Sequence, residues 1–184
     1  NIKFDLDADG CNDADALAPN IPIKIVRAAQ DLGRAFTNET GNYTTYSNST
    51  SQTTLTPQFS NSYFTVTPAS YTSSFTGFGN TETANFCIAA NGVHNDLEAG
   101  IIAITPARPG FDATYRVVYK NKGTTTQSGT VTFYFNDFYC DFVNASSVPN
   151  SIQPDLLTWT FTNLAPLETR EITIVLNVNS PIET

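Results

Sequence analysis

Apolar and polar residues alternate along most of the second half of the chain. The apolar positions of this pattern are Tyr115, Val117 and Tyr119; Val131, Phe133 and Phe135; Leu157, Trp159 and Phe161; and Ile172, Ile174, Leu176 and Val178. A period of two is typical of half-buried antiparallel strands. We therefore predict four strands here, with Leu97–Thr105 and Cys140–Ala145 as candidates for more, and Trp159 as a core residue rather than a ligand platform.

The first half has shorter strand signals between more frequent turns. Ile21, Ile23 and Ile25 share one strand face, and Pro22 favours an edge strand because proline cannot donate to a ladder. The segment Lys24–Phe36 has some helical periodicity, but the strand signal before it is stronger, so we interpret it as strand and turn. Further short strands are predicted at Asn42–Tyr46, Thr53–Pro57, Tyr63–Thr67 and Phe86–Ala89.

A turn-prone pair, Asn91-Gly92, separates these two halves. With 184 residues, the chain is long enough for two small domains. Only 14% of its residues are charged, while Thr, Ser and Asn are abundant, which suits the polar faces of strands. We predict an all-β fold of two consecutive antiparallel β-sandwich domains, Ig-like or prealbumin-like, over residues 1–92 and 93–184.

The charge pattern excludes several classes of partner. The formal net charge is −8, and the nine Lys and Arg residues do not cluster, so we expect no nucleic acid and no anionic membrane as partner. No apolar stretch approaches the roughly 18 residues that span a bilayer, so we expect no membrane insertion. The chain opens on Asn1 without Met, which we read as a processed chain or a piece of a longer one.

The sharpest local signal is an acidic segment near the start, with aspartates at every second position from Asp5 to Asp15 except position 11, which is Cys11. It matches the first nine positions of an EF-hand calcium loop, in which a glycine, here Gly10, permits a sharp turn. Carboxylate oxygens are the hard ligands that calcium prefers. The expected ligands are the carboxylates of Asp5, Asp7, Asp9, Asp13 and Asp15 and the backbone carbonyl of Cys11.

The segment departs from an EF-hand at its end, because Ala16 stands where the bidentate Glu should be. No helix is expected after it either, since Pro19 and Pro22 lead into a strand. The sequence therefore predicts a calcium loop between β elements, with Asp15 replacing the missing carboxylate. A solvated acidic turn without metal is the alternative.

The three cysteines and the single histidine form no metal or catalytic motif. No C-x-x-C spacing is present, and His94 is far in sequence from every cysteine. A Cys11–Cys87 disulfide within the first domain would contribute about 4 kcal/mol in the chain-entropy model. Alternatively, all three cysteines are small buried hydrophobes, and the role of Cys140 stays open. Since no nucleophile or acid pair carries a motif, we expect no enzyme.

Several strings in combination resemble a recurrent two-module unit of large proteins secreted by Bacteroidota through the type IX system. The strings are Phe4-Asp5-x-Asp7-x-Asp9-Gly10-Cys11, Asn85-Phe86-Cys87-Ile88, Ala107-Arg108-Pro109-Gly110-Phe111, Val118-Tyr119-Lys120-Asn121-Lys122-Gly123 and Thr162-Asn163-Leu164-x-Pro166-x-Glu168. The first module is similar to calcium-binding B-type repeats of adhesins, and the second to the Ig-like conserved repeat domain.

This resemblance implies calcium at the aspartates named above, a Cys11–Cys87 disulfide and no active site. It implies a structural or adhesive module, extracellular or on the bacterial cell surface, whose partners are neighbouring domains or identical subunits. We further expect the second module to be short of strands, and to be completed by more chain or by a strand such as Asn1–Phe4 from a neighbouring subunit, which would build a filament.

A carbohydrate-binding module of a secreted enzyme is the alternative function, with an extracellular glycan as partner. The chain contains eight Tyr and thirteen Phe, and aromatic rings offer faces on which sugars stack. The aromatic cluster that could offer such faces is Tyr63, Phe64, Tyr71, Phe75 and Phe78, and the residues expected to stack on a ligand are Tyr63, Tyr71 and Phe78. Packing of these rings in the core is the competing interpretation.

Overall fold

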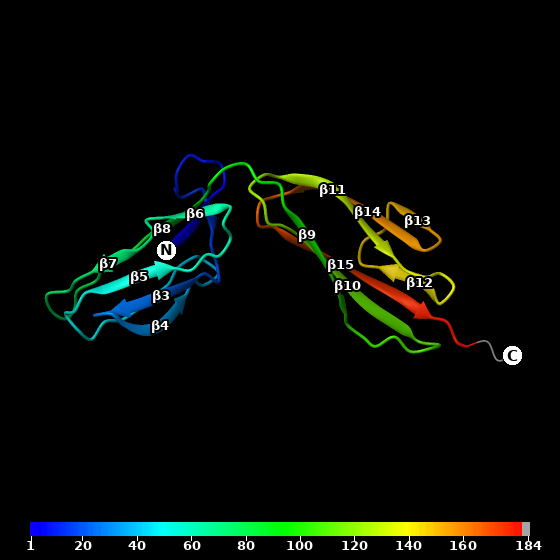
Figure 1. The fold of residues 1–184 in the computed structure, drawn as a ribbon, viewed down its shortest axis with the longest axis horizontal. Helices are drawn as coiled ribbons and strands as arrows, with labels where there is room; N and C mark the ends of the chain where they lie inside the picture. The colour runs from blue at the N-terminus through cyan, green and yellow to red at the C-terminus, as the bar shows by residue number, and fades with distance from the viewer. Residues whose placement is uncertain (182–184) are drawn as a thin grey trace. The chain divides into compact units, whose positions relative to one another are not determined.

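The computed structural model describes residues 1–181, and over this range the chain is all-β, as expected (Figure 1). None of the described residues belongs to a helix that could cross a membrane. The chain divides into two compact units, Asn1–Val93 and a second that begins at His94, one residue from the boundary placed in the sequence. Each unit contains two sheets.

The first unit contains eight described strands in two four-stranded sheets. One sheet has the order β2-β1-β8-β6 and is formed by β1 (Ile2–Asp5), β2 (Ala16–Leu17), β6 (Phe64–Thr67) and β8 (Phe86–Ala90). The other has the order β4-β3-β5-β7 and is formed by β3 (Pro22–Arg27), β4 (Gln30–Phe36), β5 (Thr53–Pro57) and β7 (Tyr71–Ser73). All pairs are antiparallel except β1 with β8, which is parallel and corrects the purely antiparallel prediction.

Two local predictions for this unit are wrong. Pro22 does not mark an edge, because β3 lies between β4 and β5. As the first residue of its strand, Pro22 is at a position where a missing N–H is tolerated. The segment Asn42–Tyr46 is not a strand; the Tyr43 hydroxyl, which donates to the Ala84 carbonyl at 2.8 Å, holds it in place.

The strand-and-turn interpretation of Lys24–Phe36 is confirmed by the β3–β4 hairpin, whose register pairs Arg27 with Gln30. The two turn residues, Ala28 and Ala29, have φ values of 46° and 69°. A two-residue hairpin with positive φ at both positions fits the twist of its strands. The interior of the unit draws on both sheets, through the buried side chains of Ile2, Ile23, Leu55, Phe64, Phe86 and Ile88.

The second unit contains seven described strands, again in two sheets. The larger has the order β12-β15-β10-β9 and is formed by β9 (Leu97–Ala103), β10 (Asp112–Asn121), β12 (Cys140–Ala145) and β15 (Thr169–Val178). The smaller has the order β11-β14-β13 and is formed by β11 (Gln127–Tyr134), β13 (Ser151–Gln153) and β14 (Leu156–Leu164). All its strand pairs are antiparallel.

The alternating residues of the sequence form one core between these two sheets. The buried cluster comprises Val117, Val131, Phe133, Leu157, Trp159, Phe161, Leu164, Ile172, Ile174 and Leu176. Trp159 is 4% exposed, and its Nε1 donates to the Ser147 carbonyl at 2.9 Å, so it is a core residue as predicted. Burial of the apolar set, at about 25 cal/mol per Å², holds the two sheets together.

The expected shortage of strands in this unit is not found. Both candidate segments form strands, β9 and β12, and β13 adds a third, so the described count reaches the seven that an Ig-like sandwich needs. The prediction that Asn1–Phe4 is the strand donated to a neighbouring subunit is also wrong. Most of it lies in β1, which pairs with both β2 and β8 and buries Ile2 completely.

A buried amide organises one end of the second unit. Asn121, the last residue of β10, is completely buried, and its Nδ2 donates to the carbonyls of Thr125 and Leu164 at 2.7 and 3.0 Å. Its Oδ1 accepts from the Gly123 N–H at 3.0 Å. A Cβ at Gly123 would lie 2.2 Å from the His94 carbonyl oxygen, so only glycine allows this close approach.

We predict that Asn121→Ala lowers the free energy of unfolding of the second unit by about 3 kcal/mol, because a buried N–H and two carbonyls lose their partner. Urea denaturation followed by Trp159 fluorescence measures this, since Trp159 is the sole tryptophan and lies in the same unit. Asn144→Ala, at an exposed position on β12, is the matched control. Equal losses in the two variants would contradict the prediction.

Candidate functional site

The acidic loop connects two paired strands. The β1–β2 register places Phe4 opposite Ala16, so the next residues toward the loop, Asp5 and Asp15, stand on either side of its base. This follows the prediction of an acidic loop between β elements. The chain between them turns sharply, with φ values of 66° at Ala8 and 92° at Gly10.

Four carboxylates converge inside this loop. One oxygen from each of Asp5, Asp7, Asp9 and Asp15 lies within 4.8 Å of the others. Asp5 is buried, Asp15 is partly buried, and Asp7 and Asp9 are exposed. Such a set of oxygen ligands has the chemistry that suits a hard divalent cation.

Asp5 also shapes the loop, because its two carboxylate oxygens accept the N–H groups of Ala8 and Gly10 at 2.7 and 3.1 Å. The other acids repel one another. Local desolvation, and then the negative charges of Asp7 and Asp15, raise the pKa of Asp9 above its usual value. The cluster therefore holds excess negative charge that a cation would relieve.

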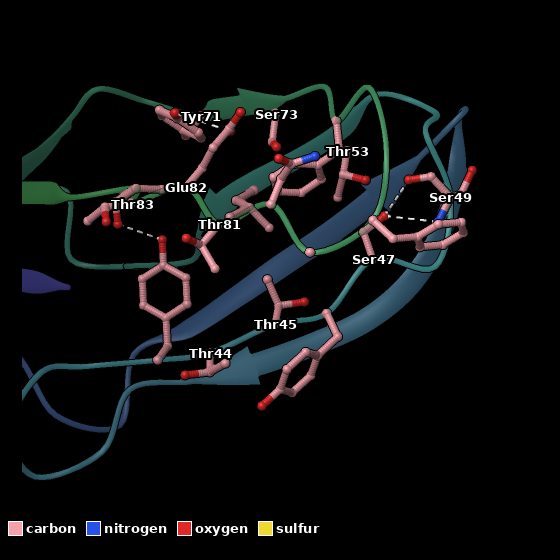
Figure 2. A pocket seen from close by; sticks show the side chains of 18 of the residues that line it. Thr44, Thr45, Ser47, Ser49, Thr53, Tyr71, Ser73, Thr81, Glu82 and Thr83 are labelled. Atoms are coloured by element: carbon pink, nitrogen blue, oxygen red, sulfur yellow. Dashed lines mark hydrogen bonds between the residues drawn. The ribbon is translucent and has the colours of Figure 1, made fainter.

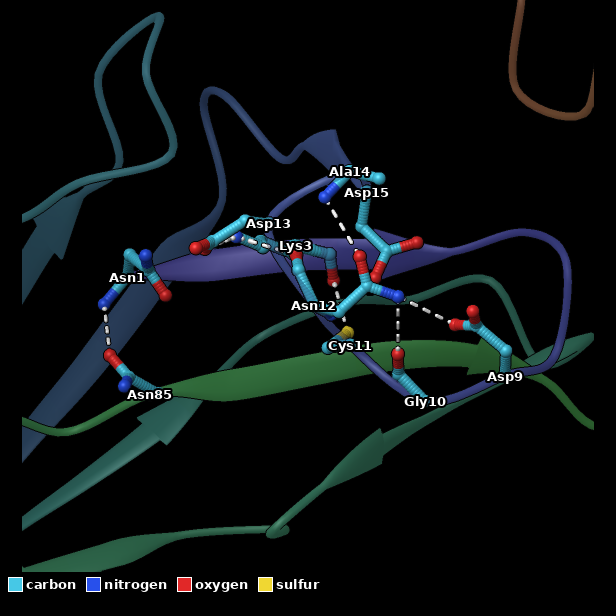
Figure 3. A network of polar contacts seen from close by, with 10 residues as sticks. All are labelled: Asn1, Lys3, Asp9, Gly10, Cys11, Asn12, Asp13, Ala14, Asp15 and Asn85. Carbon is cyan, nitrogen blue, oxygen red and sulfur yellow. Dashed lines mark hydrogen bonds and ion pairs between the residues drawn. The ribbon is translucent and has the colours of Figure 1, made fainter.

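Asp13 does not join the four. Its carboxylate lies 3.0 Å from Lys3 Nζ, and the same ammonium donates to the Asn12 carbonyl at 2.6 Å (Figure 3). Asn12 in turn donates from Nδ2 to Asp9 at 2.7 Å. Of the predicted carboxylate ligands, the structure brings together Asp5, Asp7, Asp9 and Asp15 and directs Asp13 to Lys3.

Cys11 and Cys87 form a disulfide, as the resemblance implied, with a Cα–Cα distance of 5.6 Å and a sequence separation of 76. Cys11 belongs to the acidic loop, and Cys87 lies on β8, whose register places it opposite Lys3 of β1. The bond therefore fastens the loop to a strand in the interior of its sheet. Ligation through the Cys11 carbonyl stays a prediction.

The third cysteine is a packing residue. Cys140 is partly buried against the core of the second unit and pairs with Val178 in the β12–β15 ladder. Burial, and then the charge of Asp141, raise the pKa of its thiol. A raised pKa disfavours the reactive thiolate.

A pocket of about 570 Å³ lies in the first unit (Figure 2). Its floor is one face of the β5–β7 pair, and its walls are the two loops that contain residues 42–50 and 75–84. Tyr71, Phe75 and Phe78 of the predicted aromatic cluster line it, as do two aromatic residues that were not predicted, Tyr43 and Tyr46. Tyr63, also predicted to stack on a ligand, is not among the lining residues.

The second unit has an open edge. β9 is the last strand of its sheet, and all seven of its residues are exposed, among them Leu97, Ile101 and Ile102. A groove of about 600 Å³ is lined by β9, by the edge strand β11 of the other sheet, and by Val117, Tyr119 and Phe161 behind them. Apolar surface and an unpaired strand edge thus lie together.

No family model matches the chain, and no curated protein matches it. Among solved structures it is similar to two crystal structures of BcpA, the major pilin subunit of Bacillus cereus, one of them a variant. The identities are 10% and 9%, the TM-scores 0.36 and 0.35, and the alignments cover 100% of this chain and 58% of each pilin chain. The chain thus spans less than two thirds of each pilin chain, and a likeness of this size does not establish a common function.

We predict that Cys11→Ser together with Cys87→Ser destabilises the first unit by about 4 kcal/mol, because the unfolded chain regains the freedom of a long loop. Urea melts followed by far-ultraviolet circular dichroism report the strands of both units, so the first unit is the part of the transition that Trp159 does not follow. Trp159 fluorescence from the second unit is the internal reference, and its midpoint should stay unchanged. A first-unit transition at the wild-type midpoint would refute the prediction.

Proposed function

We propose that this chain is a non-catalytic structural and adhesive module of a bacterial surface or secreted protein, built as two β-sandwiches and stiffened by calcium. The observation that carries the proposal is the acidic loop. Four carboxylates of that loop converge, and a disulfide ties the loop to β8. We assign the first sandwich to the calcium-binding B-type repeats and the second to the Ig-like conserved repeat domain.

Calcium would be held by Asp5, Asp7, Asp9 and Asp15, since their oxygens already gather within 4.8 Å of one another. Bound calcium supplies positive charge, which offsets the repulsion that raises the pKa of Asp9. Two of the carboxylates stand at the ends of β1 and β2, so the ion would join the base of the loop to its tip. Asp13 would contribute only by leaving Lys3 or through a water molecule.

An extracellular location is supported by the disulfide, because such bonds persist in oxidising compartments and are rare in the cytosol. A non-catalytic role is supported by the arrangement of the loop aspartates and by the environment of Cys140. The acids of the loop gather within 4.8 Å of one another as ligands would, and burial, followed by the charge of Asp141, raises the pKa of the Cys140 thiol.

Assembly of identical chains is supported by the open edge of the second unit. Strand β9 presents backbone groups on its outer side, and the groove beside it offers apolar surface from Leu97 and Ile101. An extended strand from another copy would pair with β9 and cover the groove, in the manner of strand addition. A head-to-tail contact of this kind builds a filament unless it closes into a ring.

The calcium proposal predicts a specific pattern of stability at pH 7. Calcium should raise the unfolding free energy of the first unit, by about 2.7 kcal/mol at one hundred times the dissociation constant. Asp7→Asn with Asp9→Asn should abolish this gain. In chelator, however, the double variant should be at least as stable as the wild type, because ionisation of Asp9 disfavours folding as the pH rises from 3.8 through its raised pKa.

Thermal melts with calcium and with chelator measure both effects. Asp13→Asn is the matched control from the same loop, and it should keep the calcium response because its carboxylate faces Lys3. Equal unfolding midpoints of the wild type with calcium and with chelator would contradict the calcium proposal.

The assembly proposal predicts that the full chain forms oligomers or filaments in solution and that Ile101→Lys with Ile102→Lys reduces them to monomers. A charged edge disfavours pairing with another strand. Light scattering after size exclusion and electron microscopy measure the state. Val148→Lys, at an exposed position outside the strands, is the control. A wild-type chain that stays a monomer of 20.0 kDa at all concentrations would contradict assembly.

A further inference from the structure

We propose that the pocket in the first unit is a binding site for a neutral oligosaccharide. This site is separate from the calcium loop and from the edge of the second unit, so it adds a ligand to the structural role. Its cavity volume, about 570 Å³, lies within the range of roughly 300–1,000 Å³ that small-ligand sites occupy.

The floor of the pocket is set by strand register. β5 and β7 pair with Thr53 opposite Ser73 and Leu55 opposite Tyr71, and all four side chains line the cavity. Residues two apart on a strand share a face, so this floor alternates a hydroxyl pair with an apolar and aromatic pair. It presents hydrogen-bonding groups beside surfaces that accept C–H groups.

Ser73 is the strongest indication of a ligand. Its side chain is 8% exposed, and its Oγ has no hydrogen-bond partner among the residues that the structure describes. A buried hydroxyl without a partner costs about 1–3 kcal/mol, so such groups are rare unless something else satisfies them. Its neighbour Thr53 is satisfied, because its Oγ1 accepts from Arg27 Nε at 3.2 Å. A ligand hydroxyl in the pocket would satisfy Ser73.

The walls combine fixed and exposed aromatic rings. Tyr43 is fixed by its hydrogen bond to the Ala84 carbonyl, and burial, followed by the nearby Tyr71, raises its pKa to about 12. Tyr46 and Phe78 are 89% and 88% exposed although both line the pocket. Aromatic side chains so exposed beside a cavity are available to stack on the apolar face of a sugar ring.

The polar groups of the walls decide the class of ligand. They are neutral hydroxyls and amides, labelled in part in Figure 2: Thr44, Thr45, Ser47, Ser49, Thr50, Asn80, Thr81 and Thr83. Glu82 is the one carboxylate among the described lining residues, and no Lys or Arg side chain is among them. The ammonium of Asn1, also in the lining, already donates to the Ala84 carbonyl and to Asn85 Oδ1 at 3.2 and 3.0 Å. An anionic ligand would therefore find no cationic side chain among the described lining residues, and a lipid chain would leave the hydroxyls unpaired. A neutral polyol with apolar ring faces satisfies both kinds of surface.

The experiment uses the full chain and an array of neutral oligosaccharides, namely the tetrasaccharides of cellulose, chitin, xylan, mannan and starch. Heparin and polygalacturonate fragments are the anionic arm, and a library of extended peptides is the protein arm. Isothermal titration follows every hit, once with calcium and once with chelator. We expect a neutral glycan to bind in both conditions and the anionic and peptide arms to fail.

Two variants assign the binding to this pocket. Phe78→Ala should weaken affinity about tenfold, because an exposed ring can contribute only to ligand contact. Ser73→Ala should weaken binding while leaving the unfolding midpoint equal or higher, since it removes an unsatisfied buried group. A serine with a purely structural role would give the opposite result, a lowered midpoint with unchanged affinity.

Matched controls are Ser74→Ala, at the exposed neighbour of Ser73 outside the pocket lining, and Tyr134→Ala, at an exposed ring of the second unit. Both should bind like the wild type. The proposal is overturned if no neutral glycan binds at millimolar concentration, if only anionic sugars or peptides bind, or if Phe78→Ala and Ser73→Ala both bind like the wild type.

Discussion

Mutual repulsion among carboxylates is the constraint around which the first unit is arranged. Asp5, Asp7, Asp9 and Asp15 would separate in a free chain, yet their oxygens gather within 4.8 Å of one another. Three covalent or hydrogen-bonded restraints hold them: the β1–β2 ladder at the base, the N–H groups that Asp5 accepts, and the Cys11–Cys87 bond. The same restraints confine the negative charge to one place in the unit.

The second unit is organised by the burial of one apolar face of each alternating strand. These strands were predicted correctly from the sequence. Positions such as Leu157, Trp159 and Ile174 are buried because a period of two directs one strand face to the core. The acidic loop was also predictable from the sequence, because aspartates spaced two residues apart around Gly10 form a local pattern. Asp13 fits that pattern as well as its neighbours do, and only the position of Lys3 on β1 separates it from them.

Features that depend on tertiary contacts could not be predicted from the sequence. The Ala28-Ala29 turn lacks the Asn-Gly sequence that usually identifies such hairpins. Pro22 is tolerated in a strand inside the sheet because it is the first residue of that strand. The parallel pairing of β1 with β8 joins segments from opposite ends of the unit. Tyr71 and Phe78 of the pocket were among the residues expected to stack on a ligand, but Ser73 was not predicted, since it differs from other serines only by the strand and loops that cover it.

The parallel pairing of β1 with β8 also orders the events of folding. β1, the first strand of the unit along the chain, finds its main partner only when the last strand of the unit, Phe86–Ala90, is present. Contacts so distant in sequence slow folding, because the closure of the intervening chain precedes any gain. A chain that is still being made therefore keeps its first unit open until residue 90 has emerged, and the Cys11–Cys87 bond can close only after that point.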